Sequence, residues 1–141
     1  MYHKVIIVGN LGRDPEMRYT PDGTPVTNFS VATTRKWGSQ DGTQSEETVW
    51  IRITAWRQLA EVCNQYLTKG RQVLVEGRLT PDRETGGPRV YTRSDGTSGA
   101  SYEVTALTVK FLGGRGEGEA DSSVSLQEPP PQEMGEDEIP F

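Results

Sequence analysis

The feature that most constrains the fold is a change of hydrophobic period at Trp56. From Val49 to Trp56, every second residue is aliphatic, which is the period of a β-strand with one buried face. From residue 57 to 69, apolar residues recur at intervals of three and four, which is the period of an amphipathic helix. The pattern therefore predicts a strand over 48–56 that is followed directly by a helix over 57–69. The residues expected on the apolar helix face are Leu59, Val62, Cys63, Tyr66 and Leu67.

Four more strands are predicted outside this junction. The first contains the apolar run Val5 to Val8 and is expected to be buried. Gly70 is expected to stop the helix, because glycine is common just past a helix end. Three strands, one helix and two strands is the order of an OB-fold, an all-β five-stranded Greek-key barrel whose helix lies between strands three and four. The four strands are expected at residues 4–10, 26–37, 72–80 and 101–111.

A long polar insertion, residues 81–100, interrupts the second half of the predicted barrel. It contains Pro81-Asp82, Gly86-Gly87-Pro88 and Asp95-Gly96, which are turn signals. A loop of this length inside a compact domain is unusual and is often functional. We interpret it as a hairpin in which residues 89–93 form one short arm.

Charge divides the chain into two parts. Residues 1–113 carry a net charge of +2, whereas residues 114–141 contain one Arg and eight acids, a net charge of −7. We predict an OB-fold domain over 1–113 and a disordered acidic tail over 114–141. A basic body joined to an acidic tail is typical of a protein whose body binds nucleic acid or another anion.

The predicted strand over 48–56 exposes two indoles. Val49, Ile51, Ile53 and Ala55 are expected to face the barrel, so that Trp50, Arg52, Thr54 and Trp56 face solvent. Indoles stack on nucleobases whatever the sequence, and each stacked base is worth ~1–3 kcal/mol. Trp37, beside two cations at the end of the second long strand, is expected to be a third stacking platform. A competing interpretation places the tryptophans in the core. It conflicts with the opposite face of the same strand, which is already wholly apolar and therefore the face expected to be buried.

Cations are placed where a nucleic-acid backbone could run along these rings. Further basic residues lie in the insertion, at Arg83, Arg89 and Arg93. Basic residues interleaved with exposed aromatic rings favour unpaired nucleic acid, because the base faces of a duplex are already stacked. The predicted binding residues are Trp37, Trp50, Trp56, Arg35, Lys36, Arg52, Arg57, Lys69, Arg71 and Arg78.

The remaining residue types argue against several other classes of protein. Cys63 and His3 are the single cysteine and histidine, which excludes an intrachain disulfide and disfavours a zinc site. Cys63 is expected to be an inert core residue. No convincing nucleophile–base pair is present, so we expect neither an enzyme nor a bound cofactor. No stretch approaches the ~20 apolar residues of a membrane span, and we expect a cytoplasmic protein without contact to a membrane.

The C-terminal tip combines acidic and apolar side chains. Ile and Phe in a tail have no core of their own, so a pocket with a basic rim on another protein is a natural destination. The alternative is a frayed acidic terminus that only aids solubility. The predicted partner-binding residues are Glu136, Asp137, Glu138, Ile139, Pro140 and Phe141.

Several of these segments resemble bacterial single-stranded DNA-binding proteins. The resemblance is carried by residues 5–16, 50–52, 59–62 and 66–70, and by the tip at 137–141. It implies a homotetramer of OB-folds that wraps single-stranded DNA in replication, recombination and repair, associated with the nucleoid. It also implies that Trp37, Trp50 and Trp56 stack on bases, that Arg52 and Lys69 contact the DNA, and that the tip recruits replication and repair enzymes.

The chain departs from the pattern of the family at three places. Ile51 stands where members often have His, and Pro81-Asp82-Arg83 replaces a segment that often holds an aromatic residue. Tyr91 is a candidate substitute for that aromatic residue. The insertion at 81–100 is also longer than is common in the family.

Two alternatives remain open at this point. An RNA chaperone or translation factor on the same fold would use the same surface, because stacking does not depend on the 2′-hydroxyl. A protein-binding adaptor without nucleic acid would explain the tip, but it would leave the Trp50, Arg52 and Trp56 face unexplained.

Overall fold

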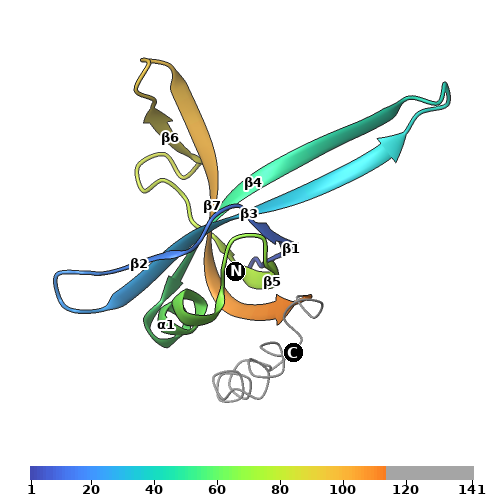
Figure 1. Cartoon of the computed structure of the whole chain (residues 1–141). Helices are drawn as coiled ribbons and strands as arrows, with labels where there is room; N and C mark the ends of the chain where they lie inside the picture. The colour runs from blue at the N-terminus through green and yellow to red at the C-terminus, as the bar shows by residue number, and fades with distance from the viewer. Residues whose placement is uncertain (114–141) are drawn as a thin grey trace.

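A computed structural model describes residues 1–113 of the chain. Within this range the chain forms seven strands and one helix (Figure 1). The predicted tail, 114–141, and its partner-binding tip lie outside the described residues. The elements are β1 (Val5–Leu11), β2 (Glu16–Tyr19), β3 (Pro25–Gly38), β4 (Gln44–Trp56), α1 (Arg57–Tyr66), β5 (Gln72–Leu79), β6 (Arg89–Thr92) and β7 (Ser98–Leu112).

Five of the strands close into a barrel. β1 pairs antiparallel with β5 and, through Asn10 and Leu11, with β3. β3 pairs antiparallel with β4, and β5 pairs antiparallel with β7. A parallel pairing of β4 with β7 over Ile51–Thr54 completes the ring. The predicted five-stranded OB-fold, with a helix between its third and fourth strands, is confirmed.

The core lies inside this barrel and under α1. Val31, Ile53 and Val75 are fully buried, as the alternation along their strands requires. The hydroxyl of Thr27 on β3 donates a hydrogen bond of 2.7 Å to the carbonyl of Ala60, which ties the helix to the barrel. Cys63 is buried on the helix, and this burial raises the pKa of its thiol to about 12. The expected inert core position of Cys63 agrees with this geometry.

The prediction that the first strand is buried is wrong for one of its faces. Ile7 lies in the core, but Ile6 is 60% exposed and Val8 is 47% exposed. A run of four apolar residues is typical of a strand with two covered faces, whereas Ile6 and Val8 on the outer face of β1 are exposed within residues 1–113. Hydrophobic periodicity reports burial without telling which molecule provides the cover.

The predicted end of the helix is also wrong. α1 ends at Tyr66, and Leu67 has extended backbone while its N–H still bonds to the carbonyl of Cys63. Leu67 is buried, so the apolar period continues past the last helical residue. Gly70, with φ of +87°, lies instead in the turn that follows, where its N–H bonds to the carbonyl of Leu11. Within residues 1–113, no helix has the length and apolar character needed to cross a bilayer.

Two arms extend from the barrel. The distal halves of β3 and β4 form one, and β6 with the first residues of β7 forms the other (Figure 1). β4 and β7 therefore begin earlier than predicted, at Gln44 and Ser98. The predicted hairpin in the insertion is confirmed, since Arg89 pairs with Ser101 and Thr92 pairs with Ser98.

Three hairpin tips share the sequence Asp-Gly-Thr and one geometry. The glycines have φ between +86° and +92°, as a type I turn closed by a left-handed glycine requires. In each tip an Asp carboxylate accepts a hydrogen bond from the backbone N–H of the following Thr. Hydrogen bonds lower the pKa of each carboxyl group, and the largest contributions come from the Thr20 hydroxyl for Asp22, the Ser39 hydroxyl for Asp41 and the Thr97 N–H for Asp95. The tips are Asp22-Gly23-Thr24 between β2 and β3, Asp41-Gly42-Thr43 between β3 and β4, and Asp95-Gly96-Thr97 between β6 and β7.

Candidate nucleic-acid interface

The outer face of β4 carries the predicted row of indole and guanidinium groups. Ile53 and Ala55 are fully buried, so the alternation turns Trp50, Arg52 and Trp56 outward. Trp50 is 54% exposed and Trp56 is 41% exposed. On β3, the small residues Ala32 and Ser30 lie opposite Trp50 and Arg52 in the register. The face therefore offers two flat apolar rings with a cation between them.

The segment after β1 supports the Trp50 ring. A Cβ at Gly12 would lie 2.4 Å from Cζ3 of Trp50, so glycine is required for the ring to lie against this backbone. Gly12 is itself held by a 3.1 Å hydrogen bond from its N–H to the carbonyl of Ser30. The indole of Trp50 is thus fixed on one side by the β1–β2 connection.

A polar pocket of about 200 Å³ is lined by Arg52 together with the carboxylates of Asp14 and Glu16. Arg13 lines the same pocket and was not among the predicted binding residues, although its place directly after Gly12 and the end of β1 is a usable signal. Asp14 accepts a 2.8 Å hydrogen bond from the backbone N–H of Lys69. The loop that carries Lys69 is therefore docked beside Arg13 and Arg52.

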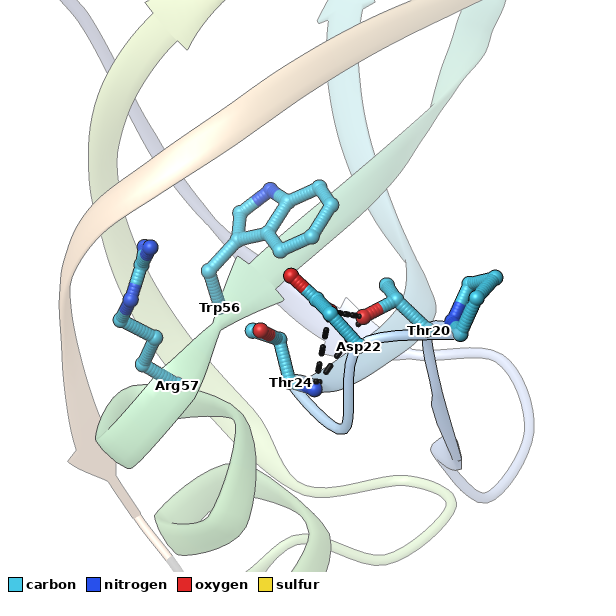
Figure 2. A pocket seen from close by; sticks show the side chains of 6 residues that line it. Thr20, Asp22, Thr24, Trp56 and Arg57 are labelled. Carbon is cyan, nitrogen blue, oxygen red and sulfur yellow. Dashed lines mark hydrogen bonds between the residues drawn. The ribbon is translucent and has the colours of Figure 1, made fainter.

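Trp56 and Arg57 line a second, more open pocket of about 580 Å³. Its other wall is the β2–β3 turn, which contributes Thr20, Asp22 and Thr24 (Figure 2). Arg57 has a φ of +54°, in the left-handed region that costs a residue with a Cβ roughly 1–2 kcal/mol. This sharp change of direction at the end of β4 places the two neighbouring side chains along one pocket.

Trp37 lies on the β3–β4 arm, away from the barrel. The guanidinium carbon of Arg35 is 4.4 Å from the centre of its ring, and the arginine is in turn 3.6 Å from a carboxylate oxygen of Glu47. Lys36 lies opposite Glu46 in the register. Trp37 is 39% exposed, as a stacking platform needs, but the two predicted cations beside it face carboxylates across the hairpin.

Two predicted cations lie apart from the β4 face. The guanidinium of Arg71 is 5.8 Å from the centre of the Phe111 ring on β7. Arg78 lies on β5 and pairs with Thr105 of β7, so that β7 separates it from β4. The insertion arm has an aromatic–cation pair of its own, since Arg93 lies 5.8 Å from the centre of the exposed Tyr91 ring.

The barrel matches a known family over nearly all of the described residues. Residues 2–112 match the single-strand binding protein family. The chain is 46% identical over 115 residues to a single-stranded DNA-binding protein of Neisseria meningitidis. The aligned segment covers 82% of this chain and 62% of the Neisseria protein. It is 39% identical over 133 residues to single-stranded DNA-binding protein 1 of Chlorobaculum tepidum. This aligned segment covers 90% of this chain and 76% of the Chlorobaculum protein.

A solved structure has the same fold. It is described as a Plasmodium falciparum SSB complex with ssDNA, and it superposes with a TM-score of 0.64 over 80% of this chain and 97% of that one. The sequence identity of 24% limits this likeness to the fold. The family match over residues 2–112 is independent of it, and together with the curated relatives it assigns the chain. The chain belongs to the single-strand binding protein family.

Proposed function

We propose that this chain binds single-stranded DNA through the outer face of β4, without catalysis and largely without sequence preference. The observation that carries the proposal is the exposed row of Trp50, Arg52 and Trp56 on a rigid barrel strand. A base stacked on an aromatic ring is worth roughly 1–3 kcal/mol in single-strand-binding proteins generally, and two such rings supply roughly 2–6 kcal/mol. The names of the Neisseria and Chlorobaculum relatives support single-stranded DNA as the ligand.

The proposed path of the strand follows the basic groups around these rings. Arg13 and Arg52 line the first pocket, and Arg57 lines the pocket in front of Trp56. Lys69 lies on the loop that docks beside the first pocket. Trp37 on the β3–β4 arm is the third proposed platform. Arg35, Lys36, Arg71 and Arg78 stay in the proposed binding set as outer contacts.

We propose a homotetramer, associated with the nucleoid in the cytoplasm. The support from the structure is the apolar outer face of β1, where Ile6 and Val8 are exposed, together with the exposed Leu107 on β7. A soluble protein gains by covering such side chains, and burial is worth about 25 cal/mol per Å² of apolar surface. Sedimentation measurements of the mutant Ile6→Glu test this, because a charge on that face should give smaller particles.

We further propose that residues 136–141 recruit enzymes of DNA replication, recombination and repair. The charge of the tail suggests that it also competes weakly with DNA for the basic surface, most of all at low salt. Deleting residues 115–141 should then leave DNA affinity equal or higher and abolish capture of partners. Loss of DNA binding on truncation would contradict this division of roles.

The experiment that tests the proposed function is a titration of the full chain with oligo-dT, with a duplex of equal length and with oligo-U RNA. Tryptophan emission should be quenched by oligo-dT at much lower concentrations than by the duplex. The affinity should fall as salt rises, because bound cations displace condensed counterions. Unquenched emission would refute the stacking platform, and a preference for the RNA would favour an RNA-binding function instead.

A further inference from the structure

The three Asp-Gly-Thr turns have the same internal geometry but different surroundings. Asp22, Asp41 and Asp95 each cap their own turn in the same way. Of the three, Asp22 is the one that lines the pocket in front of the exposed Trp56. Its turn therefore places a carboxylate beside a proposed base-stacking ring, which capping a hairpin does not require.

The carboxylate of Asp22 is held in place and keeps room for a ligand. Its Oδ1 accepts hydrogen bonds from the hydroxyl of Thr20 and from the N–H of Thr24. Figure 2 shows the carboxylate on the side of the indole, with Arg57 at the opposite side of the pocket. Because a carboxylate offers about four acceptor positions, capacity for further hydrogen bonds remains. The bonds from the two threonines also lower its pKa, so it is charged at neutral pH.

A carboxylate at the edge of a stacked base distinguishes between bases. It can only accept hydrogen bonds, and the exocyclic amino groups of cytosine, adenine and guanine donate them. Thymine and uracil present a carbonyl oxygen where cytosine has its amino group, and this oxygen repels a carboxylate. Arg57 can meet the phosphate backbone on the other side, so the charge of Asp22 does not exclude the strand.

We propose that the pocket formed by Trp56, Arg57 and the β2–β3 turn is a nucleotide subsite that favours bases with an exocyclic amino group, and that Asp22 reads that group. The inference rests on the proposed function, because the base must first stack on Trp56. It adds a base preference at one subsite to a surface that otherwise tolerates any sequence.

The test compares oligo-dC with oligo-dU of equal length, using the full chain. Cytosine has an amino group at position 4 and uracil has a carbonyl group there, and the two bases also differ in the protonation of the adjoining ring nitrogen. A homopolymer presents the same base to the subsite in every binding register. Asp22→Asn keeps an oxygen to cap the turn and removes the acceptor-only character. We expect the ratio of dC to dU affinity to fall about fivefold or more in Asp22→Asn, because hydrogen bonds to charged groups are among the stronger ones.

The chain provides a matched control in Asp41→Asn. This mutant makes the same change of charge at an identical turn outside the Trp56 pocket, and it should leave the dC to dU ratio as it is in the wild type. Any general gain in affinity from removing a negative charge cancels in the ratio. In a Trp56→Ala background, the effect of Asp22→Asn on the ratio should disappear.

The outcomes separate the two proposals. An unchanged ratio in Asp22→Asn, with both oligomers still bound, overturns the base-reading role alone. Failure of the wild type to bind either oligomer overturns the proposed function itself. If Asp22→Asn lowers the melting temperature, Asp22→Ser, which also caps turns, takes its place, and a wild-type ratio there overturns the inference in the same way.

Discussion

The outer face of β4 on the barrel and the β3–β4 arm both present an indole close to an arginine, yet they differ in what holds the ring. On the barrel, Trp50 rests against Gly12, and the strand beneath it is anchored by fully buried Ile53. On the arm, the cation facing Trp37 is Arg35, which also lies near Glu47. The comparison teaches that similar composition gives a ring supported by a distant backbone segment in one place, and in the other a ring whose neighbouring cation also faces a carboxylate.

The largest expected effect comes from removing both rings of the barrel platform. The double mutant Trp50→Ala, Trp56→Ala should lose roughly 2–6 kcal/mol of binding free energy for oligo-dT, since two stacked bases lose their partners. Trp37→Ala on the arm should cost about 1 kcal/mol. Fluorescence anisotropy of a labelled oligomer at fixed salt measures both. Equal losses from the arm and from the barrel would remove the distinction between the two regions.

The support under Trp50 can be broken without touching the ring. Gly12→Val places side-chain atoms where the indole lies, so the ring must move and binding should weaken by about 1–2 kcal/mol. A control on the arm is Gly38→Ala, whose Cβ would meet the end of the flexible Gln44 side chain at 3.3 Å. This control should bind almost as the wild type does. Wild-type affinity in Gly12→Val would show that Trp50 needs no fixed position.

The backbone strain at Arg57, at the end of β4, can be tested through the free energy of unfolding. Because Arg57 has a left-handed backbone, Arg57→Gly should be more stable to unfolding than Arg57→Ala by about 1 kcal/mol. Both mutants lose the same charge and should bind DNA equally weakly. Urea unfolding at one protein concentration gives the difference in stability. If the alanine mutant is the more stable of the two, the backbone at this position is not strained.

The smallest expected effect concerns the charge balance of the arm. Glu47→Gln removes the carboxylate that faces Arg35, and it should tighten oligo-dT binding about twofold, as exposed ion pairs are weak. The logarithm of affinity should also depend more steeply on the logarithm of salt, by about 0.7. Arg52→Gln on the barrel should make the dependence shallower by about the same amount. If the slope changes in the same direction in both mutants, Glu47 does not weaken the contact of Arg35 with the strand.

The fold was largely predictable because its signals are local. The change of period at Trp56 correctly predicted the junction of β4 and α1, and the alternation along β4 correctly turned Trp50, Arg52 and Trp56 outward. The errors occurred where a local pattern has more than one structural cause. Leu67 continues the helical period from a buried position past the helix end, and the apolar outer face of β1 is exposed within the part of the chain that the structure describes.

The candidate site was predictable in its rings and less so in its surroundings. Arg13 was missed because its place beside Arg52 depends on the turn that follows β1. Asp22 appears in the sequence as an ordinary turn residue, and its place in front of Trp56 arises from the packing of the β2–β3 turn against the end of β4. The spacing of Asp22 along the chain does not indicate that Trp56 is its neighbour.

The amino-acid sequence by itself determined the order of the elements and which side chains leave the barrel, because hydrophobic period acts within a few residues. The tertiary structure decided which distant segments two of the exposed rings meet: Gly12 lies under Trp50, and Asp22 lines the pocket in front of Trp56. Gly12 and Asp22 come from segments more than thirty residues away from their rings along the chain. Such contacts depend on strand pairing and turn geometry across the whole barrel, which no short window of sequence contains.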